Sequence, residues 1–183
     1  MLYIMRHGRT DWNDRRKLQG RTDIPLNAEG RRAAEQAREE YRDVALDICY
    51  CSPLIRAKET AQIVLHGRGI PVIPDNRLLE MSFGTLEGIE NYYTDPDSPV
   101  STLFQKPEAY TASVPGAESF VDLFGRTGGF LREVINPLMR QGRDVLIVGH
   151  WVMNLSIVCQ VRHIPLARFW STRMENCRLL RLL

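Results

Sequence analysis

Four residues with reactive or phosphate-binding side chains lie at or just beyond the ends of apolar, strand-like stretches: Arg6, His7, Arg56 and His150. A guanidinium group can bind a phosphate through two parallel hydrogen bonds and stays charged at physiological pH. An arginine beside a histidine at the end of a strand is therefore suited to chemistry on an anionic ligand. The triplet Arg6-His7-Gly8 taken alone is equally compatible with an ordinary polar turn.

Alternating strands and helices account for most of the chain. Strands are expected at 2–5, 46–51, 71–73 and 144–148, with an edge strand at 178–183. Helices are expected from an Asn27 cap to about 41, from a Ser52-Pro53 start to about 66, over about 118–140 with a weak point at Gly128-Gly129, and over 151–161. This order predicts an α/β fold, a three-layer sandwich in which a mostly parallel central sheet carries helices on both faces.

Such a sheet would bring the four polar residues together. Ligands of parallel α/β sheets bind outside the carboxyl ends of the strands. Arg6 and His7 follow the first strand, Arg56 falls in the first helical turn after the second, and His150 follows the strand at 144–148. A chance arrangement of turn residues would not easily place them all at one sheet edge.

Residues 89–115 interrupt the alternation. The segment IENYYTDPDSPVSTLFQKPEAYTASVP contains scattered proline and serine and shows no sustained period. We expect a single domain over residues 1–183, with 89–115 as an insertion that forms a lid and carries specificity.

The composition is typical of a soluble globular protein. A net charge of +2 gives no indication of nucleic-acid binding. No stretch approaches the ~18 apolar residues needed to span a membrane. The first apolar run stops too early for a secretory signal, so we expect a cytoplasmic protein. Its cysteines are expected to be buried free thiols, at positions Cys49, Cys51, Cys159 and Cys177.

Four ordered motifs resemble those of the histidine phosphatase superfamily, which includes cofactor-dependent phosphoglycerate mutases and many phosphomonoesterases. The motifs are MRHGRTDWN, LQGRTDIPLNAEG, CSPLIRAKETA and LLEMSFGTLEG, with VGHWVMN as an imperfect fifth. The resemblance covers essentially the whole chain outside residues 89–115.

The resemblance implies a catalytic set of His7, Glu80, Arg6, Arg56 and His150. His7 would be the nucleophile that attacks phosphorus and carries the phosphoryl group. It must then be neutral, and we expect a carbonyl near Gly8 to hold its other ring nitrogen. The two arginines and His150 would bind the phosphoryl group. Glu80 would be the general acid, with a pKa raised by burial or a neighbour.

The resemblance also implies a set of residues lining the phosphate pocket: Asn13, Gln19, Gly20 and Thr22. A solvated basic rim is expected from neighbouring cations: Arg9, Arg15, Arg16 and Lys17. Trp151 departs from the family, whose members usually have glycine after the second histidine. We expect its indole to form a wall of the leaving-group pocket, and obstruction of the phosphate space is the alternative.

We expect a phosphomonoesterase that acts on a small ester and requires no metal or cofactor. Phosphoglycerate mutases of this family carry a basic cluster after the loop that resembles FGTLEG. Here residues 89–115 contain one basic residue, Lys106, and four acidic residues. This favours a neutral, polar or aromatic leaving portion, such as that of a sugar, nucleoside or ribazole phosphate.

Two alternatives stay open: a cofactor-dependent phosphoglycerate mutase, and a catalytically silent module that binds a phospho-ligand. The expected partner is a small-molecule phosphate ester, with no nucleic acid and no membrane. The edge strand at 178–183 could pair across a homodimer.

Overall fold

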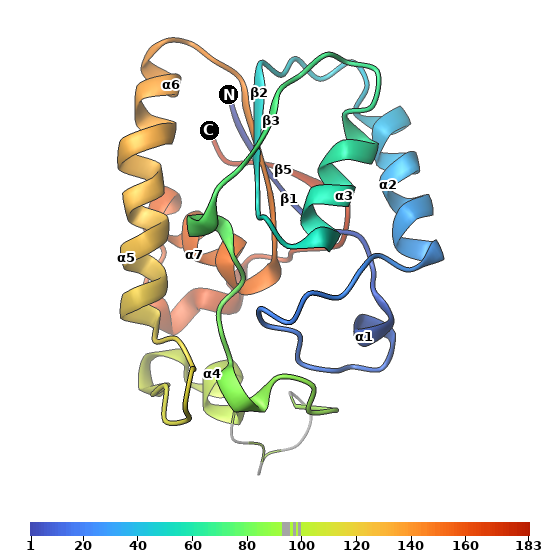
Figure 1. Ribbon diagram of the computed structural model, residues 1–183. Helices are drawn as coiled ribbons and strands as arrows, with labels where there is room; N and C mark the ends of the chain where they lie inside the picture. The colour runs from blue at the N-terminus through green and yellow to red at the C-terminus, as the bar shows by residue number, and fades with distance from the viewer. Residues whose placement is uncertain (93–95, 97, 99) are drawn as a thin grey trace.

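A five-stranded sheet runs through the centre of the protein (Figure 1). The computed structural model describes residues 1–92, 96, 98 and 100–183. The strands are β1 (Leu2–Arg6), β2 (Ile48–Cys51), β3 (Val72–Pro74), β4 (Val145–Gly149) and β5 (Leu179–Arg181). Their order in the sheet is β3-β2-β4-β1-β5, and β5 pairs antiparallel with β1 while the other pairs are parallel. The mostly parallel α/β sheet expected from the sequence is confirmed.

Helices cover both faces of this sheet (Figure 1). The α-helices are α1 (Asp11–Asp14), α2 (Ala28–Glu40), α3 (Ile55–Val64), α4 (Ser101–Gln105), α5 (Phe120–Phe130), α6 (Asn136–Arg140) and α7 (Trp151–Arg162). Short 3₁₀ turns span Asn76–Leu78, Gly84–Leu86, Pro107–Ala109 and Leu166–Ser171. Helices α2 and α3 lie on one side of the sheet, and α5 and α7 lie on the other.

The central strand β4 is buried along its whole length, so its side chains pack into the apolar clusters on both faces of the sheet. Val145 and Ile147 belong to the apolar cluster under α5 and α7, whereas Leu146 and Val148 belong to the cluster under α2 and α3. This alternation follows from the two-residue period of a strand. It explains why the sequence from Val145 to Val148 is continuously apolar.

The register of β1 on β4 positions the two histidines predicted at the strand ends. Arg6 lies opposite Gly149 in the parallel pair, so His7 and His150 leave the sheet at the same level. The N–H of His7 continues the ladder by donating to the Gly149 carbonyl at 2.9 Å.

Short-range sequence signals, such as capping residues, predict most of the helix boundaries. Asn27 caps α2 by accepting from the N–H of Gly30, as the sequence predicted. The helix expected over 118–140 runs through α5, a π-helical turn at Leu131–Ile135 and α6, with no break at the glycine pair. Its start carries a capping box between Ser119 and Asp122.

The start of α3 differs from the prediction. The helix begins at Ile55, and the hydroxyl of Ser52 accepts from the N–H of Leu54 at 3.3 Å instead of capping a helix there. Ser52 and Pro53 therefore form a turn. The first N–H of α3 is bound by the carboxylate of Asp23 at 2.8 Å, a cap that comes from a distant loop.

The described part of the segment 89–115 lies at the same end of the molecule as α1 (Figure 1). Val100 and Leu103 are fully buried in the core cluster, and the indole N–H of Trp170 donates to the Leu103 carbonyl at 2.9 Å. The ring of Tyr110 packs edge-on against Phe120 at 5.9 Å. The described part of the segment is thus packed on the body, and its action as a lid stays a prediction.

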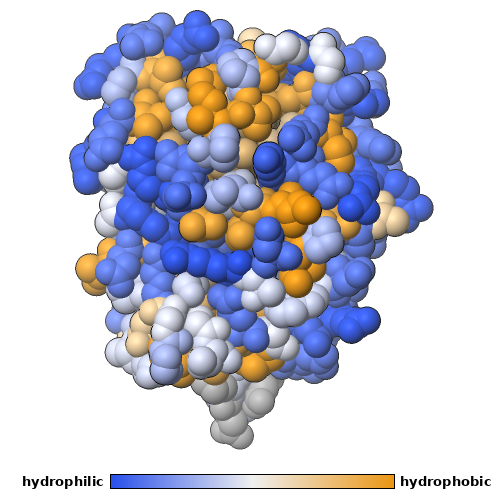
Figure 2. All heavy atoms as spheres, in the orientation of Figure 1, coloured by the Kyte–Doolittle hydropathy of each residue, from blue (hydrophilic) through white to orange (hydrophobic). Residues whose placement is uncertain are grey.

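The four cysteines are buried and free, as expected. Apolar side chains gather on one face over the β3 edge of the sheet, between more hydrophilic areas (Figure 2). Ile73 of β3 is 39% exposed. Within the described residues, no helix combines the length and the apolar character needed to cross a membrane.

Candidate active site

His7 is held as a neutral imidazole with one ring nitrogen free to react. Its side chain is buried, and Nδ1 lies 2.6 Å from the backbone carbonyl oxygen of Gly8. A carbonyl oxygen can only accept, so Nδ1 carries the proton and Nε2 carries the lone pair. Burial, followed by the nearby charges of Arg56 and Arg6, lowers the pKa of His7 well below 6.5. The expected carbonyl partner is confirmed.

The backbone around His7 is fixed from two sides. Its N–H donates to Gly149, and its carbonyl accepts from the side-chain amide of Asn176 at 2.6 Å. A Cβ on Gly8 would lie 2.6 Å from the carbonyl oxygen of Gly30, so only glycine fits where this loop meets α2. Sequence reasoning missed Asn176, which no local pattern connects to residue 7.

Arg56 lies in the first turn of α3 and is almost completely buried. Its two terminal nitrogens donate to the carbonyls of Thr22 at 2.8 Å and Gly20 at 2.7 Å. Among the described residues its Nε has no hydrogen-bond partner. Burial lowers the pKa of Arg56 to about 10, which leaves it charged at neutral pH.

Arg6 approaches the site from the end of β1. One terminal nitrogen donates to the Met174 carbonyl at 3.3 Å, and the guanidinium lies 5.3 Å from the ring centroid of Trp151. Its Nε is buried and, like that of Arg56, finds no hydrogen-bond partner in the part of the chain that the structure describes. Buried N–H groups are normally paired, so two such guanidinium nitrogens point to an anionic ligand.

His150 packs directly against His7. The two ring centroids are 5.1 Å apart with planes inclined at 60°, and His150 is fully buried. Neither of its ring nitrogens has a partner among residues 1–92, 96, 98 and 100–183. Burial, then the charge of Arg56, lowers the pKa of His150 well below 6.5, so this ring is neutral too.

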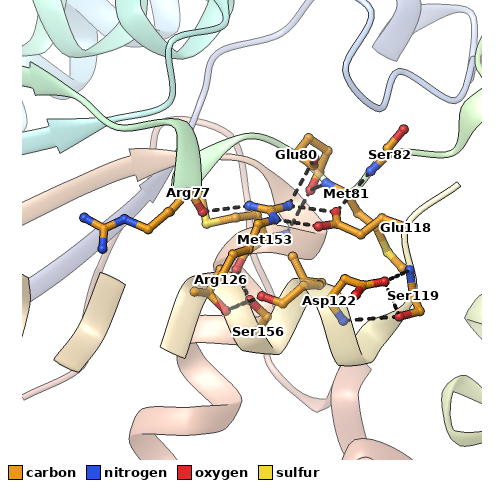
Figure 3. A network of polar contacts seen from close by, with 12 residues as sticks. Arg77, Glu80, Met81, Ser82, Glu118, Ser119, Asp122, Arg126, Met153 and Ser156 are labelled. Atoms are coloured by element: carbon orange, nitrogen blue, oxygen red, sulfur yellow. Dashed lines mark hydrogen bonds and ion pairs between the residues drawn. The ribbon is translucent and has the colours of Figure 1, made fainter. Parts of the chain in front are cut away.

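Glu80 is buried against the N-terminus of α7. Its carboxylate accepts from the backbone N–H groups of Met81 at 2.8 Å, Met153 at 2.9 Å and Val152 at 3.2 Å (Figure 3). Burial raises the pKa of Glu80, while these three hydrogen bonds and the charge of Arg56 oppose the rise. The raised pKa expected for Glu80 therefore agrees with its burial, and its role as a general acid stays a prediction.

An ion-pair network holds the backbone of Glu80 in place. The guanidinium of Arg126 binds both oxygens of the buried Glu118, at 2.6 and 2.9 Å, and also donates to the carbonyls of Arg77 and Glu80 (Figure 3). Arg21 donates to the same Glu80 carbonyl at 3.2 Å. Sequence reasoning missed Arg126 and Glu118, because they lie outside the motifs and reach Glu80 only through the fold.

Glu87 fixes the loop that holds Arg56. Its Oε1 accepts from the N–H groups of Arg21 and Phe83, and its Oε2 accepts from the N–H and hydroxyl of Thr22. Gly20 has φ of +53°, and a Cβ there would lie 2.1 Å from Glu87 Oε1. Glu87 was not singled out from the sequence, although it stands inside the LLEMSFGTLEG motif.

A small cavity of about 40 Å³ lies where these groups meet. The predicted residues that line it are Arg6, His7, Asn13, Gln19, Gly20, Arg56, Glu80 and Trp151. The side-chain oxygens of Asn13 and Gln19 both accept from Thr10, so their amide nitrogens are the atoms that can donate to a ligand.

Two predicted residues do not line this cavity. The hydroxyl of Thr22 is bound to Glu87, and its carbonyl supports Arg56, so Thr22 lies behind the cavity wall. His150 contacts the ring of His7 but is not among the residues that line this cavity. Of the expected basic rim, Arg9, Arg16 and Lys17 line a larger neighbouring cavity, and Arg15 does not.

Trp151 forms part of an aromatic wall. It is the first residue of α7 and has no left-handed φ, so the replacement of glycine strains no backbone here. Its ring lies 4.9 Å from that of Trp170 and 6.1 Å from that of Phe104, and it lines both cavities. Tyr92 and Phe104 line the smaller cavity as well, whereas Tyr93 lies outside the described residues.

Comparison with known families agrees with this geometry. The model of the histidine phosphatase superfamily (branch 1) matches residues 2–183. This chain belongs to the histidine phosphatase superfamily. A 2,3-bisphosphoglycerate-dependent phosphoglycerate mutase from Cytophaga hutchinsonii is 34% identical over 152 residues, which cover 82% of this chain and 71% of the mutase.

Solved structures of the superfamily share the fold. The α-ribazole phosphatase of Shigella flexneri matches with a TM-score of 0.82 and 26% identity, over 97% of this chain and 87% of its own. A mycobacterial glucosyl-3-phosphoglycerate phosphatase matches with a TM-score of 0.84 and 29% identity, over 97% and 90%. Membership of the histidine phosphatase superfamily supports an enzyme that acts on phosphate esters.

Proposed function

We propose that this protein hydrolyses a small phosphate monoester through a phosphohistidine formed on His7. The observation that carries the proposal is the neutral His7, whose Nε2 carries the lone pair, in one cavity with Arg6 and Arg56, whose buried Nε atoms lack a partner among the described residues. Arg6 and Arg56 are suited to bind the equatorial oxygens of a transferring phosphoryl group.

In the first step, Nε2 of His7 attacks phosphorus and the bond from phosphorus to the ester oxygen breaks. The phosphoryl group passes to the imidazole, and Glu80 in its protonated form gives its proton to the departing oxygen, releasing an alcohol. The raised pKa of Glu80 favours the protonated form that this step requires.

In the second step, water attacks phosphorus and the bond to His7 breaks. The Glu80 carboxylate takes a proton from the water, orthophosphate leaves, and both side chains return to their starting states. The hydrogen bond from Nδ1 of His7 to the Gly8 carbonyl keeps the ring in one tautomer throughout. His150, packed on the ring and neutral, is proposed as a third phosphate-binding group.

Residues 89–115, where only Lys106 is basic, lack the basic cluster that phosphoglycerate mutases of this family carry, which favours a phosphatase over a mutase. The phosphatases of known structure named above share the fold over nearly the whole chain. The mutase from Cytophaga hutchinsonii keeps phosphoglycerate mutase as the second candidate. We propose further that the protein is cytoplasmic and needs no metal or cofactor.

Turnover of an aryl phosphate by wild type and His7→Ala, in the presence of a chelator, tests the proposal. We expect chelator-resistant release of orthophosphate by wild type, loss of it in His7→Ala, and no loss in His66→Ala, whose histidine is exposed. Rapid quenching of wild type should also give a protein heavier by one phosphoryl group.

The alternatives predict different results in the same assays. A mutase would interconvert phosphoglycerates only after priming with a bisphosphate. A silent binding module would bind orthophosphate or vanadate without turnover, and the proposed hydrolysis would then be wrong.

A further inference from the structure

The two neighbouring cavities set where the rest of an ester must go. The cavity at His7 has a volume of about 40 Å³, whereas the cavity beside it has about 390 Å³. Both are lined by Arg6, Asn13, Lys17 and Trp151, so one opens beside the other. If the phosphoryl group lies at His7, as the proposed function requires, the leaving portion extends into the larger cavity.

The larger cavity is lined by four basic side chains: Arg6, Arg9, Arg16 and Lys17. None of its described lining residues is acidic. The acidic composition of 89–115 had favoured a neutral leaving portion, but its described acidic residues do not line the cavity. Glu90 pairs with Lys17 at 3.4 Å, Glu108 is exposed, and Asp95 and Asp97 lie outside the described residues.

Two of these cations, Arg9 and Lys17, already form ion pairs. Arg9 binds the carboxylate of Asp14 at 2.5 Å and lies 3.7 Å from that of Glu29. Lys17 pairs with Glu90 and lies 5.7 Å from the ring centroid of Trp12. A partnered cation offers less of its charge to a ligand.

Arg16 is different. Its side chain is exposed and, in the part of the chain that the structure describes, forms no ion pair. Its φ is +53°, a left-handed conformation that residues with a Cβ adopt rarely and that is concentrated at functional sites. Its N–H donates to the Asn13 carbonyl at 3.2 Å, and its carbonyl accepts from Asn91 at 3.0 Å, so both sides of the residue are anchored.

We propose that Arg16 is a specificity-determining residue that binds a second anionic group, a carboxylate or a phosphate, on the leaving portion of the substrate. The guanidinium, which forms no ion pair among the described residues, belongs to the lining of a cavity that is basic and has no described acidic residue. This anion site is built from the loop after α1, not from the segment 89–115. Asn13 and Trp151 line both this cavity and the cavity at His7.

A pair of non-hydrolysable ligands tests the anion site without relying on turnover. We would measure binding of 4-carboxybenzylphosphonate and its uncharged match, 4-carbamoylbenzylphosphonate, by calorimetry at low ionic strength. Wild type should bind the carboxylate about 5- to 20-fold more tightly, the range between an exposed ion pair and a charged hydrogen bond. Arg16→Ala should bring this ratio close to one, and Arg16→Lys should keep part of it.

Arg15→Ala is the matched control, because Arg15 is an exposed neighbouring arginine that does not line the cavity. It should leave the ratio unchanged. Equal affinities in wild type, no binding of either phosphonate, or a ratio lowered as much by Arg15→Ala as by Arg16→Ala would each overturn the inference. Turnover of the corresponding aryl phosphates is measured separately, so a failure of hydrolysis with the binding preference intact would count against the proposed function alone.

Discussion

Replacing Glu87 with glutamine tests how the structure positions Arg56. In the wild type, Oε1 accepts from the N–H of Arg21 at 3.0 Å and that of Phe83 at 3.2 Å, and Oε2 accepts from the N–H and hydroxyl of Thr22 at 2.8 and 2.5 Å. A glutamine at this position keeps the most hydrogen bonds when its side-chain oxygen accepts from the N–H groups of Arg21 and Phe83, as Oε1 does in the wild type. Its amide nitrogen then faces Thr22, whose hydroxyl can turn to accept but whose N–H loses its acceptor.

The expected cost follows from that single N–H group. A partly buried donor left without an acceptor costs about 1–3 kcal/mol, so Glu87→Gln should lower the free energy of unfolding by about 2 kcal/mol. With a urea m-value of about 2 kcal/mol/M, the midpoint should fall by roughly 1 M. Since Thr22 and Gly20 carry the carbonyls that hold Arg56, kcat on an aryl phosphate should also fall about tenfold.

Urea unfolding followed by tryptophan fluorescence measures the stability, and Glu133→Gln is the control. Glu133 is 69% exposed and pairs only with Arg77 among the described residues, so its loss should change the free energy of unfolding by less than about 0.5 kcal/mol. If the two variants were equally stable, Glu87 would not hold the loop at residues 19–22. The explanation given for the position of Arg56 would then be wrong.

Three further predictions concern the aromatic wall and the titrating groups. Trp151→Gly should lower kcat/KM about tenfold, because Arg6 loses the ring beside its guanidinium; steady-state kinetics on a small aryl phosphate decide this, and a rise would mean that the ring obstructs. Glu80→Gln should lower kcat about 10²- to 10⁴-fold. Wild-type kcat should fall as pH rises through the raised pKa of Glu80, and the pH profile of the variant should lack this fall. The pKa values of His7 and His150 lie below 6.5 in the folded state, so the unfolded chain binds protons that the folded protein does not. The free energy of unfolding should therefore fall below about pH 6.5, by up to about 1.4 kcal/mol per pH unit for each histidine. Urea unfolding from pH 7 to 5 measures this slope, and a slope that His150→Gln left unchanged would contradict the cause given.

The sequence was sufficient wherever a short-range signal determines the structure. The apolar stretches at 2–5 and 144–148 are buried parallel strands, and the register of such strands brings the residues after them together. Arg6, His7 and His150 were therefore placed correctly relative to one another. Asn27 caps its helix because capping depends on the residues immediately following.

The rest depends on contacts between distant parts of the chain. The start of α3 was predicted two residues early, because its first N–H is bound by Asp23 and not by Ser52. Asn176 supports the backbone of His7 although the two residues are 169 positions apart in the sequence. Arg126 likewise donates to the carbonyl of Glu80 across 46 positions. No pattern of neighbouring residues carries such information.

Charge composition was also a poor guide to the local environment. The segment 89–115 is acidic as a sequence, yet the cavity beside His7 is lined by cations from the loop after α1. Net charge along a segment does not state which side chains face a ligand, since that depends on the path of the backbone. The left-handed φ of Arg16 is a feature of that path that the residue types do not predict.

The contact between Glu80 and α7 separates two properties that enzymes often have to change together: the proton affinity of an acidic side chain and the shape of the ligand cavity. Among the groups that oppose the rise of the Glu80 pKa are two main-chain amides at the positive end of a helix, and these are present whatever side chains stand at Val152 and Met153. Trp151 and Val152 also line the cavity at His7. Substitutions at positions 151 and 152 that keep Glu80 buried can therefore alter which ester fits while both hydrogen bonds from α7 to its carboxylate remain. In this fold a lineage could exchange substrates at the start of α7 without rebuilding the proposed proton donor.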